Sequence, residues 1–217
     1  MLQQTQVDRV IPFYRNFLKR FPTAQSLAKA PLADVLRAWQ GLGYNRRAKM
    51  LHEAAKAITS LYHGRFPRAY DELRTLPGVG DYTAKAVRVF AFNEPEILIE
   101  TNVRTVFIHH FFPRKKQVSD KELISYMIHS LDKKNPREWY SALMDYGTYI
   151  KSTMPNPSRR SKHHTKQKPF KGSDREIRGA ILRESLKVGR LNLAPLPFDK
   201  ARVREQLAKL KAEGLIS

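Results

Sequence analysis

The octet at residues 76–83, which reads Leu-Pro-Gly-Val-Gly-Asp-Tyr-Thr, constrains the fold more than any other part of the chain. Pro77 cannot continue a helix, and Gly78 and Gly80 can both take the positive φ of a tight turn. Apolar residues at helical spacing follow, so we expect a second helix whose first backbone N–H groups are exposed. Such a helix start can bind a phosphate. The octet therefore predicts a helix-turn-helix corner, either a plain structural one or one that binds nucleic acid.

The charge of the chain favours the second possibility. Lys and Arg number 40 against 20 Asp and Glu, which gives a net charge of +20. A field of this strength attracts polyanions, so we expect nucleic acid as the partner. A membrane surface is the competing target, but the apolar stretches are far shorter than the roughly 20 residues of a spanning helix, and no signal-peptide pattern opens the chain. We expect a cytoplasmic, nucleoid-associated or nuclear protein that is not secreted and not bound to a membrane.

The absence of cysteine excludes several kinds of site. Without thiols the chain cannot form disulfides, thiolate zinc sites or cysteine-ligated iron–sulfur clusters. The two His pairs, 109–110 and 163–164, are adjacent in sequence, so their side chains point apart on a helix or a strand. We therefore expect no metal and no cofactor.

The apolar periodicity predicts an all-α fold, because no segment shows the alternation typical of a sheet. Helices are expected at residues 6–20, 24–30, 32–39, 46–62, 70–75, 83–92, 103–111, 123–131, 139–150, 173–186 and 199–213. Ser173 and Glu176 match a capping box at one of these helix starts. Residues 152–171 are rich in Pro and basic side chains and lack periodicity, which is typical of a linker or a phosphate-contacting arm.

Four motifs together resemble those of the helix-hairpin-helix DNA glycosylases, most closely the MutY-like, adenine-specific mismatch glycosylases. In chain order they are Met1-Leu-Gln-Gln-Thr-Gln-Val7, Trp39-Gln-Gly-Leu-Gly-Tyr44 followed by Arg46-Arg47-Ala48, the octet, and Glu100-Thr-Asn-Val103. The resemblance covers residues 1 to about 150. It implies a helix-hairpin-helix glycosylase fold, shortened at its N-terminus, in which a mispaired base is flipped into a cleft between two helical domains.

The domains that follow from this resemblance are consecutive in sequence. They are a barrel-like helical domain with the hairpin at residues 1–113, an incomplete second helical domain at 114–151, a basic linker or arm at 152–172, and a helical tail at 173–217. The tail resembles either part of a winged helix or a plain helical pair. The implied partner is double-stranded DNA with a mismatched or damaged base, bound by a monomer.

Glu100 is the first candidate catalytic residue. Cleavage of an N-glycosidic bond builds positive charge on the sugar, so a carboxylate is needed near C1′. Glu100 follows an apolar run and starts a helix, where a carboxylate can be buried and aimed; the alternative is an acid that merely stabilises the helix start. The resemblance places Asn102 near the same sugar, although Asn at a helix start is also a common cap.

Tyr82 occupies the position that separates two chemistries in the family. The resemblance implies that a lysine there attacks C1′ and lets the enzyme nick the strand, whereas tyrosine goes with simple base removal by water. It therefore implies a monofunctional glycosylase. The alternative is an aromatic side chain that packs beside the hairpin.

The resemblance also implies a set of DNA-contacting residues. They are Gln3, Gln4, Thr5, Tyr44, Arg46, Leu76, Gly78, Val79, Gly80 and Thr83. Amides at Gln3 and Gln4 would probe the helix opposite the flipped base, where the ring of Tyr44 would replace lost stacking. For the two glutamines, an exposed polar helix start is the alternative.

Three features depart from the family pattern. The proton-donating glutamate of the family lies two residues before the position matched by Met1, which fits a start placed too late, a different acid, or weakened catalysis. The catalytic aspartate is here Glu100, one methylene longer, and geometry of this kind affects rate strongly. The four-cysteine cluster of many members is missing, with Lys151 at the position of its first cysteine.

These observations order the possible functions. Excision of adenine opposite 8-oxoguanine or guanine comes first, because residues 2–5 and Tyr44 favour that branch. Removal of thymine or uracil from mismatches with guanine comes second, and a DNA-binding descendant without catalysis third. The tail is too short and too helical to be the C-terminal domain with which adenine-specific members sense 8-oxoguanine.

Overall fold

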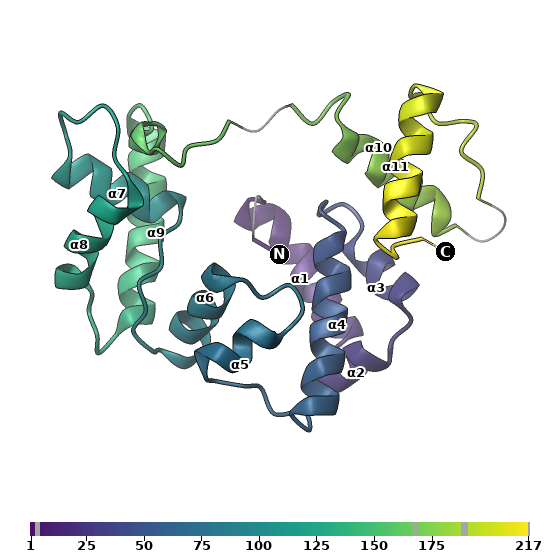
Figure 1. Cartoon of the computed structure of the whole chain (residues 1–217), viewed down its shortest axis with the longest axis horizontal. Helices are drawn as coiled ribbons and strands as arrows, with labels where there is room; N and C mark the ends of the chain where they lie inside the picture. Colours follow the sequence, from purple (N-terminus) through teal and green to yellow (C-terminus); the bar gives the residue numbers. More distant parts are fainter. Residues whose placement is uncertain (3–4, 167–168, 188–190, 217) are drawn as a thin grey trace. The chain divides into compact units, whose positions relative to one another are not determined.

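The computed structural model describes residues 1–2, 5–166, 169–187 and 191–216. Within these ranges the chain forms eleven α-helices, one 3-10 helix and no strand. The helices are α1 (Val7–Arg20), α2 (Ala24–Lys29), α3 (Leu32–Trp39), α4 (Arg46–Leu61), α5 (Tyr70–Thr75), α6 (Asp81–Phe92), α7 (Thr101–Phe111), α8 (Asp120–Ser130), α9 (Pro136–Thr153), η1 (Pro157–Arg160), α10 (Asp174–Ser185) and α11 (Lys200–Ala212) (Figure 1). The predicted all-α class is confirmed. Across the same described residues, no helix is long and apolar enough to cross a bilayer.

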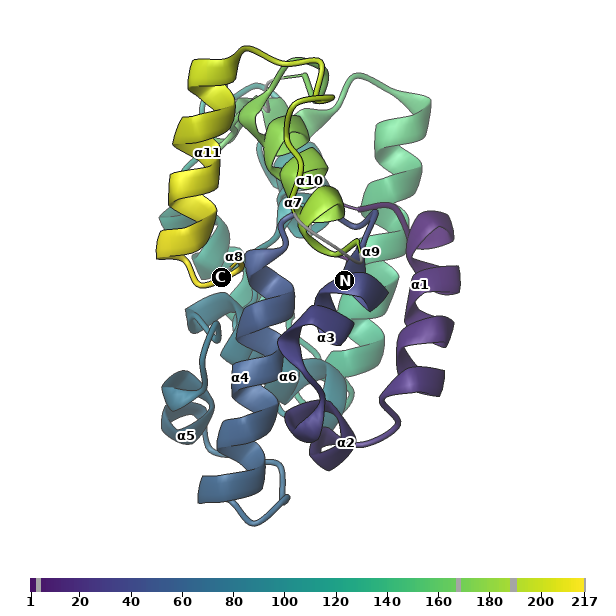
Figure 2. The ribbon, with the colours of Figure 1, turned by 90° about the vertical axis from the view of Figure 1, so that its right-hand side faces the viewer.

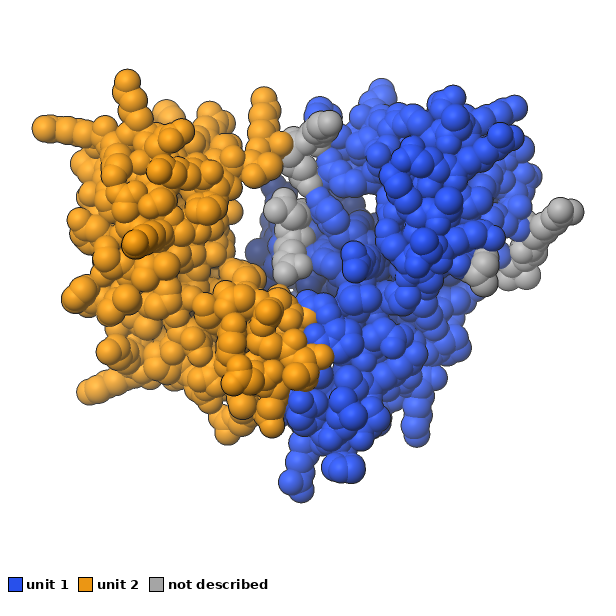
Figure 3. Space-filling view, viewed as in Figure 1, with its two compact units in different colours: residues 1–67, 76–78, 168–217 blue, residues 68–75, 79–167 orange. Residues whose placement is uncertain are grey.

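The chain divides into two compact units, each discontinuous in sequence (Figure 3). Unit 1 contains residues 1–67, 76–78 and 168–217, and unit 2 contains residues 68–75 and 79–167. These boundaries differ from the consecutive domains expected from the sequence. The difference arises because α6 and α7 share an apolar core with α8 and α9, while the C-terminal tail shares one with the first helices.

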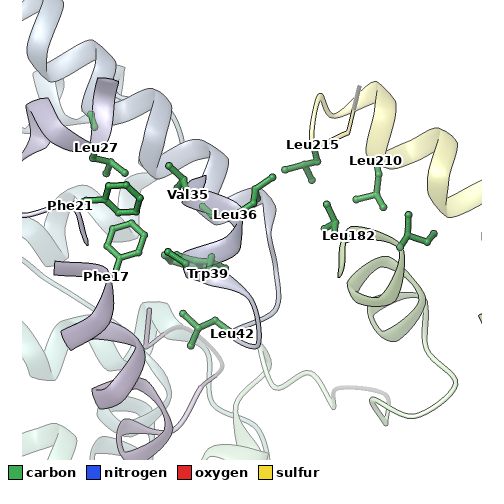
Figure 4. Close-up of a cluster of buried hydrophobic side chains, with 14 of the residues drawn as sticks. Phe17, Phe21, Leu27, Val35, Leu36, Trp39, Leu42, Leu182, Leu210 and Leu215 are labelled. Atoms are coloured by element: carbon green, nitrogen blue, oxygen red, sulfur yellow. The ribbon is translucent and has the colours of Figure 1, made fainter. Parts of the chain in front are cut away.

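The core of unit 1 combines the N-terminal helices with the tail. The Phe17 ring meets the rings of Phe21 and Trp39 edge-on, with centroids 5.0 and 6.0 Å apart (Figure 4). The tail adds buried residues to the same cluster: Ile177, Ile181, Leu182, Val203, Leu210 and Leu215. Because apolar burial is the main favourable term in folding, the tail is an integral part of this unit.

Polar contacts reinforce the attachment of the tail. Helices α10 and α11 lie side by side in both ribbon views (Figures 1 and 2). The Arg37 guanidinium donates to the carbonyl of Leu186, the C-cap of α10, and the Lys49 ammonium donates to the carbonyl of Glu213, the C-cap of α11. A cation at a helix C-terminus satisfies carbonyls that lack a partner within the helix and interacts favourably with the dipole.

The start of α10 differs in detail from the prediction. Ser173 is the N-cap, but the predicted capping box is wrong, because the Ser173 hydroxyl donates to the Phe170 carbonyl at 2.6 Å. The Glu176 carboxylate instead accepts from the backbone N–H of Gly172 at 2.6 Å. Gly172 has φ +74°, and this left-handed turn brings its own N–H, rather than that of Ser173, to the carboxylate.

The core of unit 2 centres on α7, which packs against α9. Tyr140 of α9 is fully buried, and its hydroxyl accepts from the Leu98 N–H and donates to the Glu96 carbonyl, both at 2.8 Å. Burial raises the pKa of this phenol to about 12. The two hydrogen bonds fix the extended segment that leads into α7.

Part of the basic segment expected at residues 152–172 is ordered against unit 2. Residues 157–160 form η1, and Val118 pairs with Ser161 in an isolated parallel bridge. The Arg160 guanidinium donates to four carbonyls at and beyond the end of α7: those of Ile108, Phe112, Pro113 and Lys115. One arginine thus holds a turn that apolar periodicity could not reveal.

Candidate active site

Glu100 is the N-cap of α7, and its side chain turns back onto its own helix. Its Oε1 accepts from the backbone N–H of Val103 at 2.8 Å. Leu98, two residues earlier, is 1% exposed and anchors the approach to the helix. The apolar run before Glu100 therefore places a carboxylate at the edge of the unit 2 core, as the sequence predicts.

Opposing effects act on the Glu100 carboxyl. Burial, the largest effect, raises its pKa. The backbone N–H groups of Val103 and Asn102 and the cations of Lys151 and Arg104 lower it. Burial prevails, so the ionised group lacks full stabilisation by its surroundings. A desolvated carboxylate interacts strongly with any positive charge that develops beside it.

Asn102 lies where α7 and α9 approach closely. A Cβ on Gly147 of α9 would lie 2.6 Å from the Asn102 carbonyl oxygen and 2.7 Å from its Cβ, so only glycine fits there. The Asn102 Oδ1 is buried and accepts no hydrogen bond from the described residues. A buried acceptor of this kind is costly unless a ligand or water satisfies it.

Tyr82 lies in the first turn of α6 and is 38% exposed. Burial and the nearby charge of Glu100 raise the pKa of its phenol, while Arg104 acts in the opposite direction. The effect of Glu100 on this phenol places both side chains in one electrostatic environment within unit 2. With its pKa raised above the ordinary value, the phenol is neutral at neutral pH.

Two cations near Glu100 belong to this site, although the sequence analysis did not propose them. Arg104 pairs with Asp120 through two parallel contacts of 2.8 and 2.7 Å. This pairing raises the pKa of Arg104 and lowers that of Asp120, so both stay charged. Lys151 lies four residues, about one helical turn, after Gly147 on α9. A charge at Arg104, four positions after Glu100, is one turn away on the same helix and could have been found by that spacing.

The glycine corner forms as expected with one exception. Gly78 has φ +76°, and a Cβ there would lie 2.6 Å from the Met50 Cβ, so glycine is required twice over. Gly80, in contrast, has φ −85° and serves as the N-cap of α6. The expectation of positive φ at Gly80 is wrong, because the turn is completed by Gly78 alone.

The helix start at the corner remains open to an anion. Among the described residues, no side chain caps the α6 N–H groups, and the Asp81 carboxylate pairs with the Tyr70 hydroxyl at 2.6 Å and with Lys85 at 3.0 Å. Of the predicted DNA contacts here, Leu76 is buried, Val79 and Thr83 are half-buried, and Gly78 and Gly80 are exposed. Leu76 to Gly78 belong to unit 1 and the others to unit 2.

Tyr44 lies in unit 1, in the loop between α3 and α4. It is 42% exposed and has a positive φ of 47°, which is uncommon for a bulky residue. The Arg47 guanidinium lies over the rings of both Trp39 and Tyr44, 5.5 and 5.4 Å from their centroids. Arg47 therefore supports the aromatic residue that the sequence predicts to face DNA.

The other predicted contacts of unit 1 are distributed around this loop. Arg46, the first residue of α4, is exposed, whereas Arg47 is half-buried, and burial lowers the pKa of Arg47. Thr5 donates its backbone N–H to the Leu2 carbonyl at 3.3 Å. Gln3 and Gln4 lie outside the described residues.

The chain cannot supply the ligands of the four-cysteine cluster, because it has no cysteine. In the part of the chain that the structure describes, no three His, Asp or Glu side chains are grouped to hold a metal ion. Lys151, which the resemblance aligns with the first of those cysteines, carries an amine and not a thiolate.

Two curated relatives show how far the chain resembles known proteins. Adenine DNA glycosylase of Mycolicibacterium smegmatis is 53% identical over 106 residues, which are 49% of this chain and 36% of that protein. Adenine DNA glycosylase of Buchnera aphidicola subsp. Baizongia pistaciae is 35% identical over 154 residues, or 69% of this chain and 43% of that protein. The chain thus spans less than half the length of either relative.

A solved structure and a family pattern complete the comparison. A thermostable thymine-DNA glycosylase shares the fold, with a TM-score of 0.60 and 24% identity over 72% of this chain and 73% of that chain. Residues 1–128 match the family described as HhH-GPD superfamily base excision DNA repair protein. Because this match covers more than half of its length, the chain belongs to the HhH-GPD superfamily of base excision DNA repair proteins.

Proposed function

We propose that this chain is a monofunctional DNA glycosylase that hydrolyses the N-glycosidic bond of a mispaired adenine in double-stranded DNA. The observation that carries the proposal is Glu100, a desolvated carboxylate fixed at the start of α7. Tyr82 and Asn102 lie in the same unit, and Glu100 acts electrostatically on Tyr82. The protein would act as a monomer.

The chemistry follows from the charge at Glu100. As the base leaves with the electrons of the glycosidic bond, the sugar becomes oxocarbenium-like and positive at C1′. The carboxylate stabilises this charge more strongly in the transition state than in the neutral ground state, which is the requirement for catalysis. Water then adds to C1′ and loses a proton, while the departing base gains one. The Val103 N–H holds the carboxylate in place during this change.

Tyr82 accounts for the monofunctional character. A phenol cannot form a Schiff base, and the raised pKa keeps it neutral. Without an amine nucleophile at this position, the expected product is an intact abasic site. Tyr82 would instead form one wall of the site beside Glu100.

Adenine is the proposed base because both relatives described above are named adenine DNA glycosylases. Their similarity extends over 106 and 154 residues of this chain, respectively. The proposed opposite base is 8-oxoguanine or guanine. Thymine or uracil opposite guanine is the competing substrate class.

A single-turnover assay tests the proposal. Duplexes with adenine opposite 8-oxoguanine, adenine opposite guanine, thymine opposite guanine and uracil opposite guanine are incubated with an excess of protein, and released base is measured. Glu100→Gln keeps the shape of the side chain and loses its charge, so we expect base release to fall by at least about a hundredfold while DNA affinity stays unchanged. Glu138→Gln, which neutralises an exposed carboxylate of α9, serves as the matched control.

The outcomes separate the alternatives. Release of thymine or uracil alone would reassign the substrate. DNA binding with no release of any base, by the chain or by a form extended upstream in frame, would favour a DNA-binding protein without catalysis. If the Glu100→Gln variant released base at the parental rate, the role of Glu100 would be limited to capping α7.

A further inference from the structure

The loop that presents Tyr44 is held from several sides within unit 1. The Trp39 indole N–H and the Arg47 guanidinium both donate to the Gly43 carbonyl, at 3.1 and 3.4 Å. The Arg9 guanidinium donates to the Gly41 carbonyl at 2.5 Å. These contacts fix the backbone of the loop, and a further contact reaches the hydroxyl of the Tyr44 ring.

That contact comes from the C-terminal tail. Arg175, in the first turn of α10, donates from its Nη1 to the Tyr44 hydroxyl at 3.5 Å, across 131 positions of sequence. The Arg47 guanidinium covers the ring face of Tyr44, so the aromatic side chain is contacted at both its face and its tip. Arg175 is half-buried, and this burial restricts where its guanidinium can lie.

Several interactions hold Arg175 itself. Its guanidinium lies 5.9 Å from the centroid of Phe170 and donates to the Pro169 carbonyl at 3.5 Å. Two turns of α10 behind it are anchored by Ile177 and Ile181, both 0% exposed in the shared core of unit 1. The rigid attachment of α10 therefore transmits a fixed position to the guanidinium, because a core packed at crystal density allows little sliding.

We propose that the C-terminal helical pair α10–α11 is part of the DNA-reading surface, and that Arg175 is a positioning residue that presents Tyr44 to the strand opposite the excised base. The inference rests on the proposed function, since it assigns Tyr44 to the opened duplex. A ring that enters a base stack gains most when its rotamer is fixed beforehand, because ordering it on binding costs free energy. The tail would thus contribute to base recognition by positioning Tyr44, and not as a separate domain that contacts the base itself.

The ratio of two affinities tests this role. The probes are a duplex with a tetrahydrofuran abasic analogue opposite guanine and the same duplex fully paired, measured at one salt concentration. Removing a charge that only attracts phosphate weakens both complexes alike. Loss of the Tyr44 position should instead weaken the abasic complex selectively, so we expect Arg175→Ala to lower the ratio about three- to fivefold.

Matched variants identify the contact responsible. Arg183→Ala removes an exposed arginine from the same helix and should leave the ratio unchanged. Tyr44→Phe removes only the hydroxyl and should reproduce the loss seen with Arg175→Ala. Because both changes break one interaction, the double variant should lose no more than either single variant. Far-UV circular dichroism and the unfolding midpoint check that each variant is folded.

Three results would overturn the inference: an equal ratio for Arg175→Ala and Arg183→Ala, multiplying losses in the double variant, or no preference of the parental chain for the abasic duplex. Each is independent of base release. Release of adenine with an unchanged ratio would leave the proposed function standing without this role for Arg175. A lowered ratio for Arg175→Ala without base release by the parental chain would support this role for Arg175 and contradict the proposed function.

Discussion

The Glu100 carboxyl is held between burial, which raises its pKa, and two backbone N–H groups and two cations, which lower it. Its oxygen reaches back to the Val103 N–H while the chain stays extended at the N-cap, with φ −132°. At the scale of single residues, the buried Glu100 carboxylate lowers the stability of the fold, and it can stabilise a positive charge that develops beside it. Sites of this kind trade stability for activity.

A pH series of unfolding measurements tests this balance. Because the folded-state pKa of Glu100 is raised, the protonated form favours the fold, and stability is lost as pH rises through the folded pKa. We expect Glu100→Gln to be more stable than the parental chain at neutral pH, with an advantage that shrinks as the pH falls below about 4, where Glu becomes neutral in both states. Urea denaturation at each pH measures this difference, and Glu138→Gln on α9 is the control variant.

At the scale of elements, the pairing of α7 with α9 builds the site. Gly147 permits backbone contact with Asn102, and Lys151 follows one turn later on α9. The extended segment before α7 is fixed by the buried hydroxyl of Tyr140. A small change in the α7–α9 distance would therefore move Glu100 and Asn102 relative to Lys151.

Two alanine substitutions measure this close approach. Gly147→Ala would place a Cβ 2.6 Å from a backbone oxygen, so we expect a loss of about 1–3 kcal/mol in the free energy of unfolding. At Gly179, in the middle of α10, a Cβ would meet nothing within 4 Å, so alanine should be neutral or stabilising by up to about 1 kcal/mol. Urea unfolding of both variants is the measurement, and equal effects would refute the tight α7–α9 contact.

The sequence predicted the helices well and the connections less well. Apolar spacing is a local signal, so α3 and α5 match the predicted ranges, and α4 ends one residue early. The η1 turn was not predicted, because it depends on hydrogen bonds from Arg160 to carbonyls 45 to 52 positions away. Effects that arise only in space, such as the electrostatic effect of Lys151 on Glu100, leave no pattern in a single sequence.

At the scale of the whole molecule, the tail is not a separate domain. Its residues Ile177 and Leu210 are fully buried in the core that also holds Trp39. The sequence showed that the tail is helical, but the partner of its apolar face was hidden because it lies about 140 positions earlier in the chain. The net charge of +20 is summed over the whole chain and would attract a polyanion such as DNA.

Salt dependence of DNA affinity tests the role of this charge. If about four phosphates are contacted, affinity for any duplex should fall about a hundredfold between about 50 and about 200 mM salt, because counterions are released on binding. Fluorescence anisotropy with labelled duplexes of unrelated sequence measures the slope. An affinity that does not change with salt would contradict a phosphate-contacting surface.

The most direct test of the site is Tyr82→Lys. If Tyr82 faces the same sugar as Glu100, an amine there would attack C1′, form a Schiff base and nick the strand, which the parental phenol cannot do. Desolvation, the largest influence at this position, and the neighbouring Arg104 would lower the pKa of this amine, whereas the Glu100 carboxylate would raise it. We predict that the lysine variant of an active form gives a protein–DNA adduct trapped by borohydride, whereas the parental chain gives none. Base release without a trapped adduct would contradict the placement of the active site beside Tyr82 and Glu100.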